Sequence, residues 1–223
     1  ETSESKSPSL EKENSALRAV IIANGLLNQA ITLHPDDLLI AADGGARHCL
    51  ELGLRPAYVV GDLDSLDATQ LATLEALGAQ IVRYPTHKDY TDLELALQHA
   101  RQWGASEALI LGALGARWDQ TAANILLAAA FTDLPVSLAD GQQQLFFVHA
   151  GEQLEICGQP GDTVSLIPLT PQAQGVTTHN LEYPLDQETL FFGSTRGVSN
   201  VLQTACATVS LEEGVLLCTI IHS

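Results

Sequence analysis

Short apolar runs alternate, over the first 131 residues, with segments whose apolar side chains recur at helical spacing. Most of these runs end in Asn, Asp or Gly, as buried strands end in loops, and they occupy 19–23, 38–42, 58–60, 80–84 and 108–111. The segments between them favour helices at 46–52, 67–77, 91–103 and 122–131. Strands that alternate with helices over short connections predict an α/β domain with a doubly wound, mainly parallel sheet.

The pattern changes near Pro135, beyond which no segment has helical spacing. Strand-like runs separated by Gly, Pro and Asn follow, and the clearest are 145–149, 163–168, 205–211 and 215–221. A succession of short strands predicts a small all-β domain, a sandwich. We therefore expect a flexible tail at 1–16, an α/β domain at 17–140 and a β-sandwich domain at 141–223.

Composition and charge narrow the class of protein. With 46% hydrophobic and 17% charged residues the chain is not a disordered one, and its net charge of −17 disfavours nucleic acid as a partner. No apolar run approaches the ~20 residues that span a bilayer, and residues 1–15 lack the apolar core of a secretory signal. The cysteines form no CxxC pair, so we expect reduced thiols and a cytoplasmic protein; they are Cys49, Cys157, Cys206 and Cys218.

Charged side chains follow the ends of four predicted strands, where open α/β sheets bind their ligands. They are Asp43; Asp62 and Asp64; Lys88, Asp89 and Asp92; and Arg117 and Asp119. So many carboxylates at one edge repel each other unless their pKa values rise or a cation lies among them. Oxygen ligands without His or Cys suit Mg²⁺, which often binds phosphate groups as well. The alternative for Asp62 and Asp64 is an ordinary loop or a helix cap.

A Gly-rich turn, GALGAR, separates the fifth predicted strand from the last predicted helix. Gly112 and Gly115 allow backbone N–H groups to reach a phosphate, although the GK[ST] of a Walker motif is absent. Arg117 either binds phosphate with two hydrogen bonds or pairs at the surface with Asp119. Arg196 is the one lysine or arginine of the sequence after Arg117. It faces either an anion or an acid of its own domain.

Five short motifs occur in the order and spacing of the thiamine pyrophosphokinase family, which the chain resembles over roughly residues 19–221. They are DGGA at 43–46, GDLDS at 61–65, KDYTDLE at 88–94, GARWDQ at 115–120 together with Asn124, and RGVSN at 196–200. One departure is Ala116, where the family commonly has a second glycine. If that glycine had a positive φ, alanine would be strained there.

The resemblance implies transfer of pyrophosphate from ATP to the hydroxyl of thiamine, with release of AMP. It implies an α/β catalytic domain that binds ATP and Mg²⁺, a β-sandwich that binds thiamine, and a homodimer with shared active sites. The metal ligands it implies are Asp62, Asp64 and Asp92. The residues it implies for ATP are Lys88, Gly112, Gly115, Arg117, Gln120 and Asn124, and those for thiamine are Arg196, Ser199 and Asn200. Asp43, Asp89 and Asp119 stay open as groups that orient the hydroxyl or accept its proton.

Three alternatives share parts of this pattern. A pyrophosphokinase that acts on another alcohol, such as a hydroxymethylpterin, would have a similar α/β half. A Mg²⁺-dependent nucleotide hydrolase would use water in place of the alcohol. A nucleotide-binding regulatory module without turnover is disfavoured, because binding alone rarely needs acids on four loops.

Overall fold

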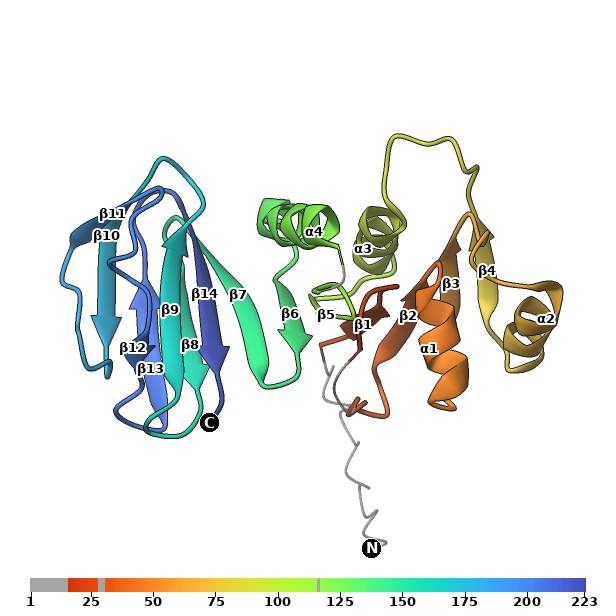
Figure 1. Cartoon of the computed structure of the whole chain (residues 1–223), viewed down its shortest axis with the longest axis horizontal. Helices are drawn as coiled ribbons and strands as arrows, with labels where there is room; N and C mark the ends of the chain where they lie inside the picture. The colour runs from red at the N-terminus through yellow and green to blue at the C-terminus, as the bar shows by residue number, and fades with distance from the viewer. Residues whose placement is uncertain (1–15, 28–30, 116) are drawn as a thin grey trace, which may run out of the picture.

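The first half of the chain alternates strands and helices, and the second half consists of strands (Figure 1). The computed structural model describes residues 16–27, 31–115 and 117–223, so Ala116 and nearly all of the predicted tail lie outside the described residues. The strands of the first half are β1 (Arg18–Ile22), β2 (Leu38–Ala42), β3 (Tyr58–Gly61), β4 (Gln80–Arg83), β5 (Glu107–Leu111) and β6 (Val136–Asp140). The helices are α1 (Gly45–Glu51), α2 (Ala68–Ala76), α3 (Asp92–Gln102) and α4 (Trp118–Ala130). The later strands are β7 (Gln143–His149), β8 (Gln153–Cys157), β9 (Thr163–Pro168), β10 (Gln172–His179), β11 (Glu188–Phe191), β12 (Asn200–Val201), β13 (Cys206–Ser210) and β14 (Val215–Ile221).

Two of the helices begin at side chains that cap them. Asp67 accepts the N–H of Gln70 at 2.8 Å, and the side chain of Gln70 accepts the N–H of Asp67 at 3.0 Å, which forms a capping box at the start of α2. Thr91 Oγ1 accepts the N–H of Glu94 at 3.2 Å and caps α3. The cap at Thr91 therefore determines where Asp92, the first residue of α3, is presented. Among the residues described, none of the helices combines the length and apolarity needed to cross a membrane.

The strands of the first half form the parallel part of a ten-stranded sheet with the order β12-β9-β14-β7-β6-β5-β1-β2-β3-β4. β1 pairs in parallel with both β2 and β5, so the strand order reverses direction there. Two core clusters take alternate residues of β1 and β2 and hence lie on opposite faces of the sheet. One face is covered by α3 and α4, which contribute Leu97 and Ala128, and the other by α1 and α2, which contribute Cys49 and Leu74. This is the predicted doubly wound arrangement.

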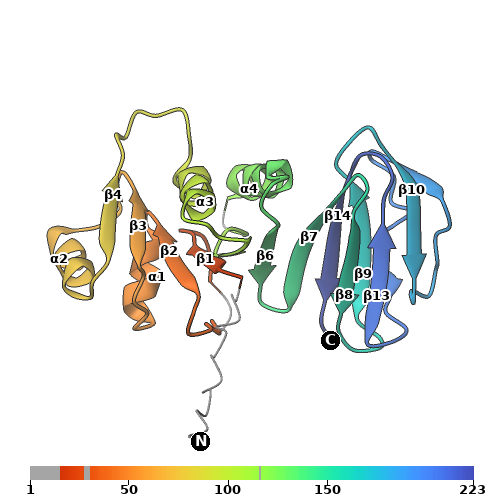
Figure 2. The same cartoon turned by 180° about the vertical axis from the view of Figure 1, so that it is seen from behind.

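The parallel strands continue directly into the second half of the chain. β6 and β7 form an antiparallel hairpin in which Leu138 is opposite Leu145, so one sheet runs through both halves (Figure 2). The core of the α/β half also contains Leu145 from β7 and Leu217 from β14. The predicted order of an α/β part and an all-β part is confirmed, but the two parts share a sheet and a core.

A second, four-stranded sheet completes the all-β part. Its order is β11-β10-β13-β8. It packs on the part of the long sheet formed by β12, β9, β14 and β7, around a core that includes Ile156, Val164, Val209 and Leu216. Two antiparallel sheets thus face each other across an apolar core, as in a sandwich.

The cysteines contradict the prediction that all thiols are reduced. Cys157 on β8 and Cys206 on β13 are directly opposite each other, with Cα atoms 4.1 Å apart, and form a disulfide. Cys157, Cys206 and Glu155 lie close enough together to hold a metal ion, but the disulfide leaves neither cysteine with a thiolate to bind one. Cys49 and Cys218 are free, and burial raises the pKa of each thiol to about 12. Because disulfides are rare in reducing compartments, the cytoplasmic location stays a prediction.

Candidate active site

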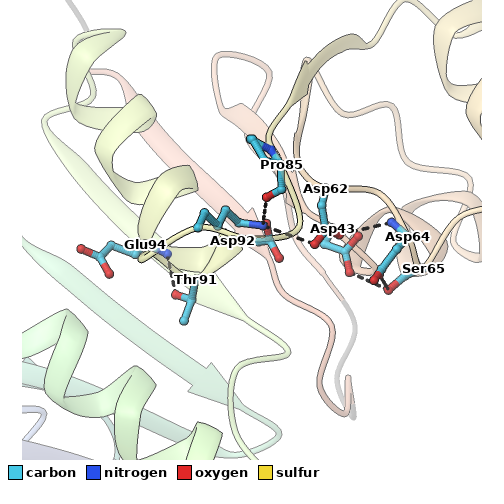
Figure 3. A network of polar contacts seen from close by, with 9 residues as sticks. Asp43, Asp62, Asp64, Ser65, Pro85, Thr91, Asp92 and Glu94 are labelled. Atoms are coloured by element: carbon cyan, nitrogen blue, oxygen red, sulfur yellow. Dashed lines mark hydrogen bonds and ion pairs between the residues drawn. The ribbon is translucent and has the colours of Figure 1, made fainter.

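Three carboxylates meet at the edge of the sheet where the parallel strands end (Figure 3). Asp43 directly follows β2, Asp62 directly follows β3, and Asp92 begins the helix after β4. One carboxylate oxygen from each lies within 4.8 Å of the other two. The topology therefore brings three separate loops together as an acid cluster, defined here as Asp43, Asp62 and Asp92.

Lys88 supplies positive charge to the acid cluster. Its Nζ lies 3.0 Å from Asp92 Oδ1 and 3.4 Å from Asp62 Oδ2, and it donates to the carbonyl of Pro85 at 3.3 Å. The side chain is 12% exposed. Burial opposes its charge, but the two carboxylates outweigh this effect and raise the pKa of Lys88. Lys88 is therefore a cation held in one place, as phosphate-binding lysines are.

The surroundings act differently on the pKa values of Asp92 and Asp62. Desolvation raises the pKa of Asp92, the charges of Asp43 and Asp62 raise it further, and Lys88 offsets only part of the rise. Desolvation is also the largest effect at Asp62, but the backbone N–H of Asp64, which donates at 3.2 Å, together with Lys88 lowers the pKa of that carboxyl. The cluster thus contains one acid that ionises readily and one whose ionisation an added cation would favour.

Two oxygen atoms of the acid cluster are buried without a hydrogen bond. Asp43 Oδ2 accepts from the hydroxyl of Ser65 at 2.6 Å, but Asp43 Oδ1 has no hydrogen-bond partner among the described residues. Asp92 Oδ1 forms an ion pair with Lys88 Nζ at 3.0 Å and has no other polar partner there. Unpaired buried acceptors are unfavourable, and carboxylate oxygens are the ligands that Mg²⁺ prefers. This donor set therefore fits Mg²⁺.

The backbone beside the acid cluster adopts uncommon conformations. Asp43 has a φ of 43° and Leu63 a φ of 66°, values that residues other than glycine seldom adopt. Gly61 has a φ of 152°, and a side chain there would meet Asp92 Oδ1 at 2.9 Å and Asp43 Cβ at 3.0 Å. Glycine at this position lets the two acids approach each other. Backbone strain of this kind is commonly retained at functional sites.

The second carboxylate of the GDLDS motif lies beside the acid cluster rather than in it. Asp64 is exposed, and its Oδ1 lies 3.5 Å from the hydroxyl of Ser65. Its backbone N–H supports Asp62. Asp43 takes the third place in the group, and Ser65, which was not a candidate site residue from the sequence, orients it.

Arg117 and Asp119 pair with each other at the surface. Nε and Nη2 of Arg117 donate to the two carboxylate oxygens at 3.1 and 2.5 Å, and the side chains are 65% and 66% exposed. This is the surface pairing that the sequence left open as the alternative to phosphate binding. Gly115 and Gln120, on either side of this pair in the sequence, are exposed, and so is Asp89.

The Gly-rich turn after β5 packs against the turn after β1. The N–H of Gly25 donates to the carbonyl of Gly112 at 2.7 Å. Gly112 has a φ of 68°, and a side chain there would meet the carbonyl of Ala23 at 2.8 Å. Asn124 of α4 donates to the carbonyl of Ala113 at 2.8 Å and so holds the turn in place. The two turns meet where the strand order reverses, the usual ligand site of open α/β sheets.

The turn after β1 was not among the candidate residues from the sequence. Asn24 Oδ1 accepts from Arg47 Nη2 at 3.0 Å, and the carbonyl of Gly25 lies 2.9 Å from His48 Nε2. These contacts attach the turn to α1. The sequence signal was present, since Asn24-Gly25 ends the first apolar run in the same way that Asp43-Gly44 ends the second.

The RGVSN segment leads into β12 at the far edge of the long sheet. Arg196 pairs with Glu188 at 2.6 Å, and both side chains are partly exposed. This is the pairing with an acid of its own domain that the sequence allowed. Ser199 is exposed with a φ of 61°, and its N–H donates to the hydroxyl of Ser165 at 3.0 Å.

Asn200 is buried, and its amide is engaged within the chain. Its Oδ1 accepts the N–H of Tyr183 at 3.0 Å, and its Nδ2 donates to the carbonyl of Tyr183 at 2.8 Å. The sequence suggested that this side chain contacts a ligand directly. The geometry instead makes Asn200 the support of Tyr183, a residue that is 64% exposed.

The acid cluster and the RGVSN segment lie far apart within one chain (Figure 1). Asn200 begins β12, at one edge of the long sheet, and Asp62 follows β3, eight places along the strand order. At about 4.8 Å between neighbouring strands this separation is roughly 38 Å before twist is considered. A cavity of about 540 Å³ near β6 and β7, lined in part by Phe131 and His149, is a third location, and no predicted site residue lines it among those described.

Comparisons with known proteins match the first and the second half of the chain separately. A family model described as "Thiamin pyrophosphokinase, catalytic domain" matches residues 31–138, and one described as "Thiamin pyrophosphokinase, vitamin B1 binding domain" matches residues 153–216. The chain is 29% identical to a thiamine pyrophosphokinase of Bacillus subtilis over 203 residues, which cover 88% of this chain and 95% of the relative. It is 25% identical over 228 residues to thiamine pyrophosphokinase 1 of Oryza sativa subsp. japonica, covering 91% and 86%.

Solved structures give the same result. The crystal structure of thiamine pyrophosphokinase from Bacillus subtilis has a TM-score of 0.82 at 26% identity, covering 93% of this chain and 99% of the other. That of thiamin pyrophosphokinase from Geobacillus thermodenitrificans has a TM-score of 0.81 at 27% identity, covering 93% and 98%. With both halves matched, in the order that the fold requires, the chain belongs to the thiamine pyrophosphokinase family.

Proposed function

We propose that this chain transfers pyrophosphate from ATP to the hydroxyl of thiamine, with release of AMP, and that it does so at the acid cluster. The observation that carries the proposal is the convergence of Asp43, Asp62 and Asp92 around Lys88 at the carboxyl edge of the parallel strands. Phosphoryl-type transfer needs charge neutralisation and positioning more than covalent chemistry. Carboxylates for a metal ion and a fixed ammonium group supply both.

Mg²⁺ is the ion for which we propose these carboxylates are arranged. Asp43, Asp62 and Asp92 would hold it, in place of the set Asp62, Asp64 and Asp92 expected from the sequence. When bound, the ion neutralises charge on the phosphate oxygens of ATP. Lys88 adds a second positive charge beside the same oxygens, and Ser65 keeps Asp43 turned toward the cluster.

The Gly-rich turn is the part of the site that we assign to the other phosphates. Gly115 is exposed, and a Gly-rich turn before a helix can present backbone N–H groups to an anion, while Gly112 and Asn124 hold the turn in place. The guanidinium of Arg117 already binds both oxygens of Asp119, and the same fork matches two phosphate oxygens. Binding of ATP would therefore exchange one anion for another at Arg117.

In this proposal Ser199 and Tyr183 contact thiamine. Asn200 holds Tyr183 in place, and Arg196 lies nearby in the sequence. The roughly 38 Å that separates this segment from the acid cluster in one chain is too far for one small molecule to bridge. We therefore propose a homodimer in which the β part of one chain completes the site on the α/β part of the other. The net charge of −17 favours approach of the cationic thiazolium ring.

The test is incubation with ATP, Mg²⁺ and thiamine, followed by quantification of AMP and thiamine diphosphate. Formation of both in equal amounts supports the proposal. Transfer to a hydroxymethylpterin but not to thiamine would identify the other pyrophosphokinase. Release of AMP at the same rate without any alcohol would identify a hydrolase, and binding of ATP without turnover a regulatory module.

A further inference from the structure

The loop that contains Lys88 begins at a tyrosine that is attached to two neighbouring elements. Tyr84 directly follows β4, and its N–H donates to the carbonyl of Gly61 at 2.8 Å. Its hydroxyl lies 2.7 Å from Nε2 of His99 on α3. We propose that Tyr84 and His99 are positioning residues that hold Lys88 against the acid cluster, an inference that rests on the proposed function.

α3 connects this hydrogen bond to the site. His99 is seven residues, or about two helical turns, beyond Asp92, so both side chains lie on the same face of the helix. The ring of His99 stacks on Trp103 with centroids 4.7 Å apart and an interplanar angle of 18°. Trp103 in turn stacks on Tyr58 at 3.6 Å. His99 is thus fixed in orientation, and its Nε2 offers Tyr84 one defined position.

The other nitrogen of His99 argues against a purely structural role. Within the described part of the chain, Nδ1 is buried without a hydrogen-bond partner. A buried polar atom that is left unpaired is unfavourable, and burial also lowers the pKa of His99. An apolar side chain would pack on Trp103 without this cost. The contact that the imidazole adds is the one with the hydroxyl of Tyr84.

The position of Lys88 follows from both ends of its loop, and Figure 3 shows Pro85 at one end and Thr91 and Asp92 at the other. Pro85, the residue after Tyr84, accepts from Lys88 Nζ at 3.3 Å through its carbonyl. At the other end, Thr91 caps α3 and places Asp92, which lies 3.0 Å from the same Nζ. Without the tyrosine hydroxyl, the first end of the loop would keep its backbone hydrogen bond and the packing of the Tyr84 ring but would lose its hydrogen bond to α3.

The test begins with Tyr84→Phe, which keeps the ring and removes the hydroxyl. Affinity for Mg²⁺–ATP, measured directly by titration calorimetry, should fall about five- to tenfold, the order of one lost hydrogen bond, and the KM for thiamine should stay unchanged. His99→Gln, whose amide can reach the position of Nε2, should retain most of the affinity, and His99→Leu should behave like Tyr84→Phe. Arg101→Gln, which removes an exposed ion pair between the same helix and Asp133, is the control and should leave this affinity unchanged.

A double variant tests whether Tyr84 acts through Lys88. In a Lys88→Met background, Tyr84→Phe should cause no further loss of Mg²⁺–ATP affinity, and this measurement does not depend on turnover. A full further loss would show that Tyr84 acts on something else. Normal affinity in Tyr84→Phe together with a lowered Tm would make the contact structural only. A wild-type chain that binds Mg²⁺–ATP but does not use thiamine would contradict the proposed function and leave the positioning test intact.

Discussion

At the scale of single residues, the geometry of the acid cluster depends on the residues around it as much as on the three carboxylates. Gly61 leaves the space in which Asp43 and Asp92 approach each other, and Ser65 donates to the carboxylate of Asp43. The family resemblance implied Asp64 as a metal ligand, and alternate residues such as Asp62 and Asp64 share a face only where the segment is extended. Leu63 has a positive φ, so the segment is not extended and the alternation does not hold there.

The choice between Asp43 and Asp64 is open to a direct test. Asp43→Asn should lower kcat about a hundredfold or more, because loss of a metal ligand removes several kcal/mol of transition-state stabilisation. Asp64→Asn should lower it less than about tenfold, since the backbone N–H that supports Asp62 remains. Both rates are measured at saturating Mg²⁺, with Tm values to confirm folding. A larger loss for Asp64→Asn would restore the metal set expected from the sequence.

Asp162 provides a prediction about pH and stability. This buried carboxylate accepts from the N–H of Gln159 at 2.9 Å, from Nδ1 of His222 at 2.8 Å and from the N–H of Ser223 at 3.0 Å. These donors hold the pKa of Asp162 well below its ordinary value. The ionised form therefore contributes stability that is fully present above the unfolded pKa of about 3.9 and is lost as the pH falls toward the folded pKa.

The measurement is the Tm of the wild type and of Asp162→Asn as a function of pH. The variant should melt several degrees lower at pH 7, because its amide N–H groups cannot accept from the donors that surround Asp162. The difference should shrink below about pH 4, where the wild-type carboxylate begins to lose its advantage. A difference that stays constant down to pH 2 would mean that the packing of the side chain, not its charge, provides the stability.

At the scale of elements, the caps link helix stability to the site. Thr91→Ala should lower the free energy of unfolding by about 1 kcal/mol, the usual effect of losing an N-cap, and should weaken Mg²⁺ binding because Asp92 is the next residue. Thr91→Ser should restore both. Asp67→Ala, at the capping box of α2, is the matched control with a similar loss of stability and normal Mg²⁺ binding. Equal effects of the two alanine variants on Mg²⁺ binding would contradict a special role for the α3 cap.

Element positions in the α/β half could be read from the sequence, because strand alternation, helical spacing and caps are local properties. Beyond β5 the expected strands correspond to β7, β9, β13 and β14, and the sequence analysis did not single out β6, β8, β10, β11 and β12. Strand partners could not be read from the sequence. The pairing of β6 with β7, which joins the two halves, and that of β8 with β13, which places Cys157 opposite Cys206, arise from the register of the folded sheets. The absence of a CxxC pair was therefore no guide to the state of these thiols.

The paired β8 and β13 strands predict how the thiols react. In the native oxidised protein no thiol should react with a disulfide reagent, because Cys49 and Cys218 are buried with pKa values of about 12. After mild reduction Cys157 and Cys206 should react, since the first is exposed and the second partly so. The remaining two should react only on unfolding. Thiol titration in these three states checks the count, and two reactive thiols in untreated protein would contradict the disulfide.

At the scale of the whole molecule, the long sheet separates the two regions to which the proposed function assigns ATP and thiamine. Its middle strands, β6 and β7, belong to neither the acid cluster nor the RGVSN segment, and they keep these parts at a set distance within one chain. The motifs could be recognised in the sequence one by one. Their separation could not, since it depends on the sheet continuing through the β6–β7 hairpin.

A shared site in a homodimer predicts that two inactive variants restore each other. Asp62→Asn should inactivate the acid cluster, and Asn200→Ala should weaken thiamine binding by releasing Tyr183. When the two chains are unfolded, mixed in equal amounts and refolded, half of the dimers should be mixed, and each mixed dimer should have one intact site out of two. Activity should therefore return to about a quarter of the wild-type value.

Each variant refolded alone is the control, and subunit composition is verified with two different affinity tags. No recovery in verified mixed dimers would mean that each chain closes its own site, which would require the RGVSN segment to cross the roughly 38 Å of sheet that separates it from the acid cluster.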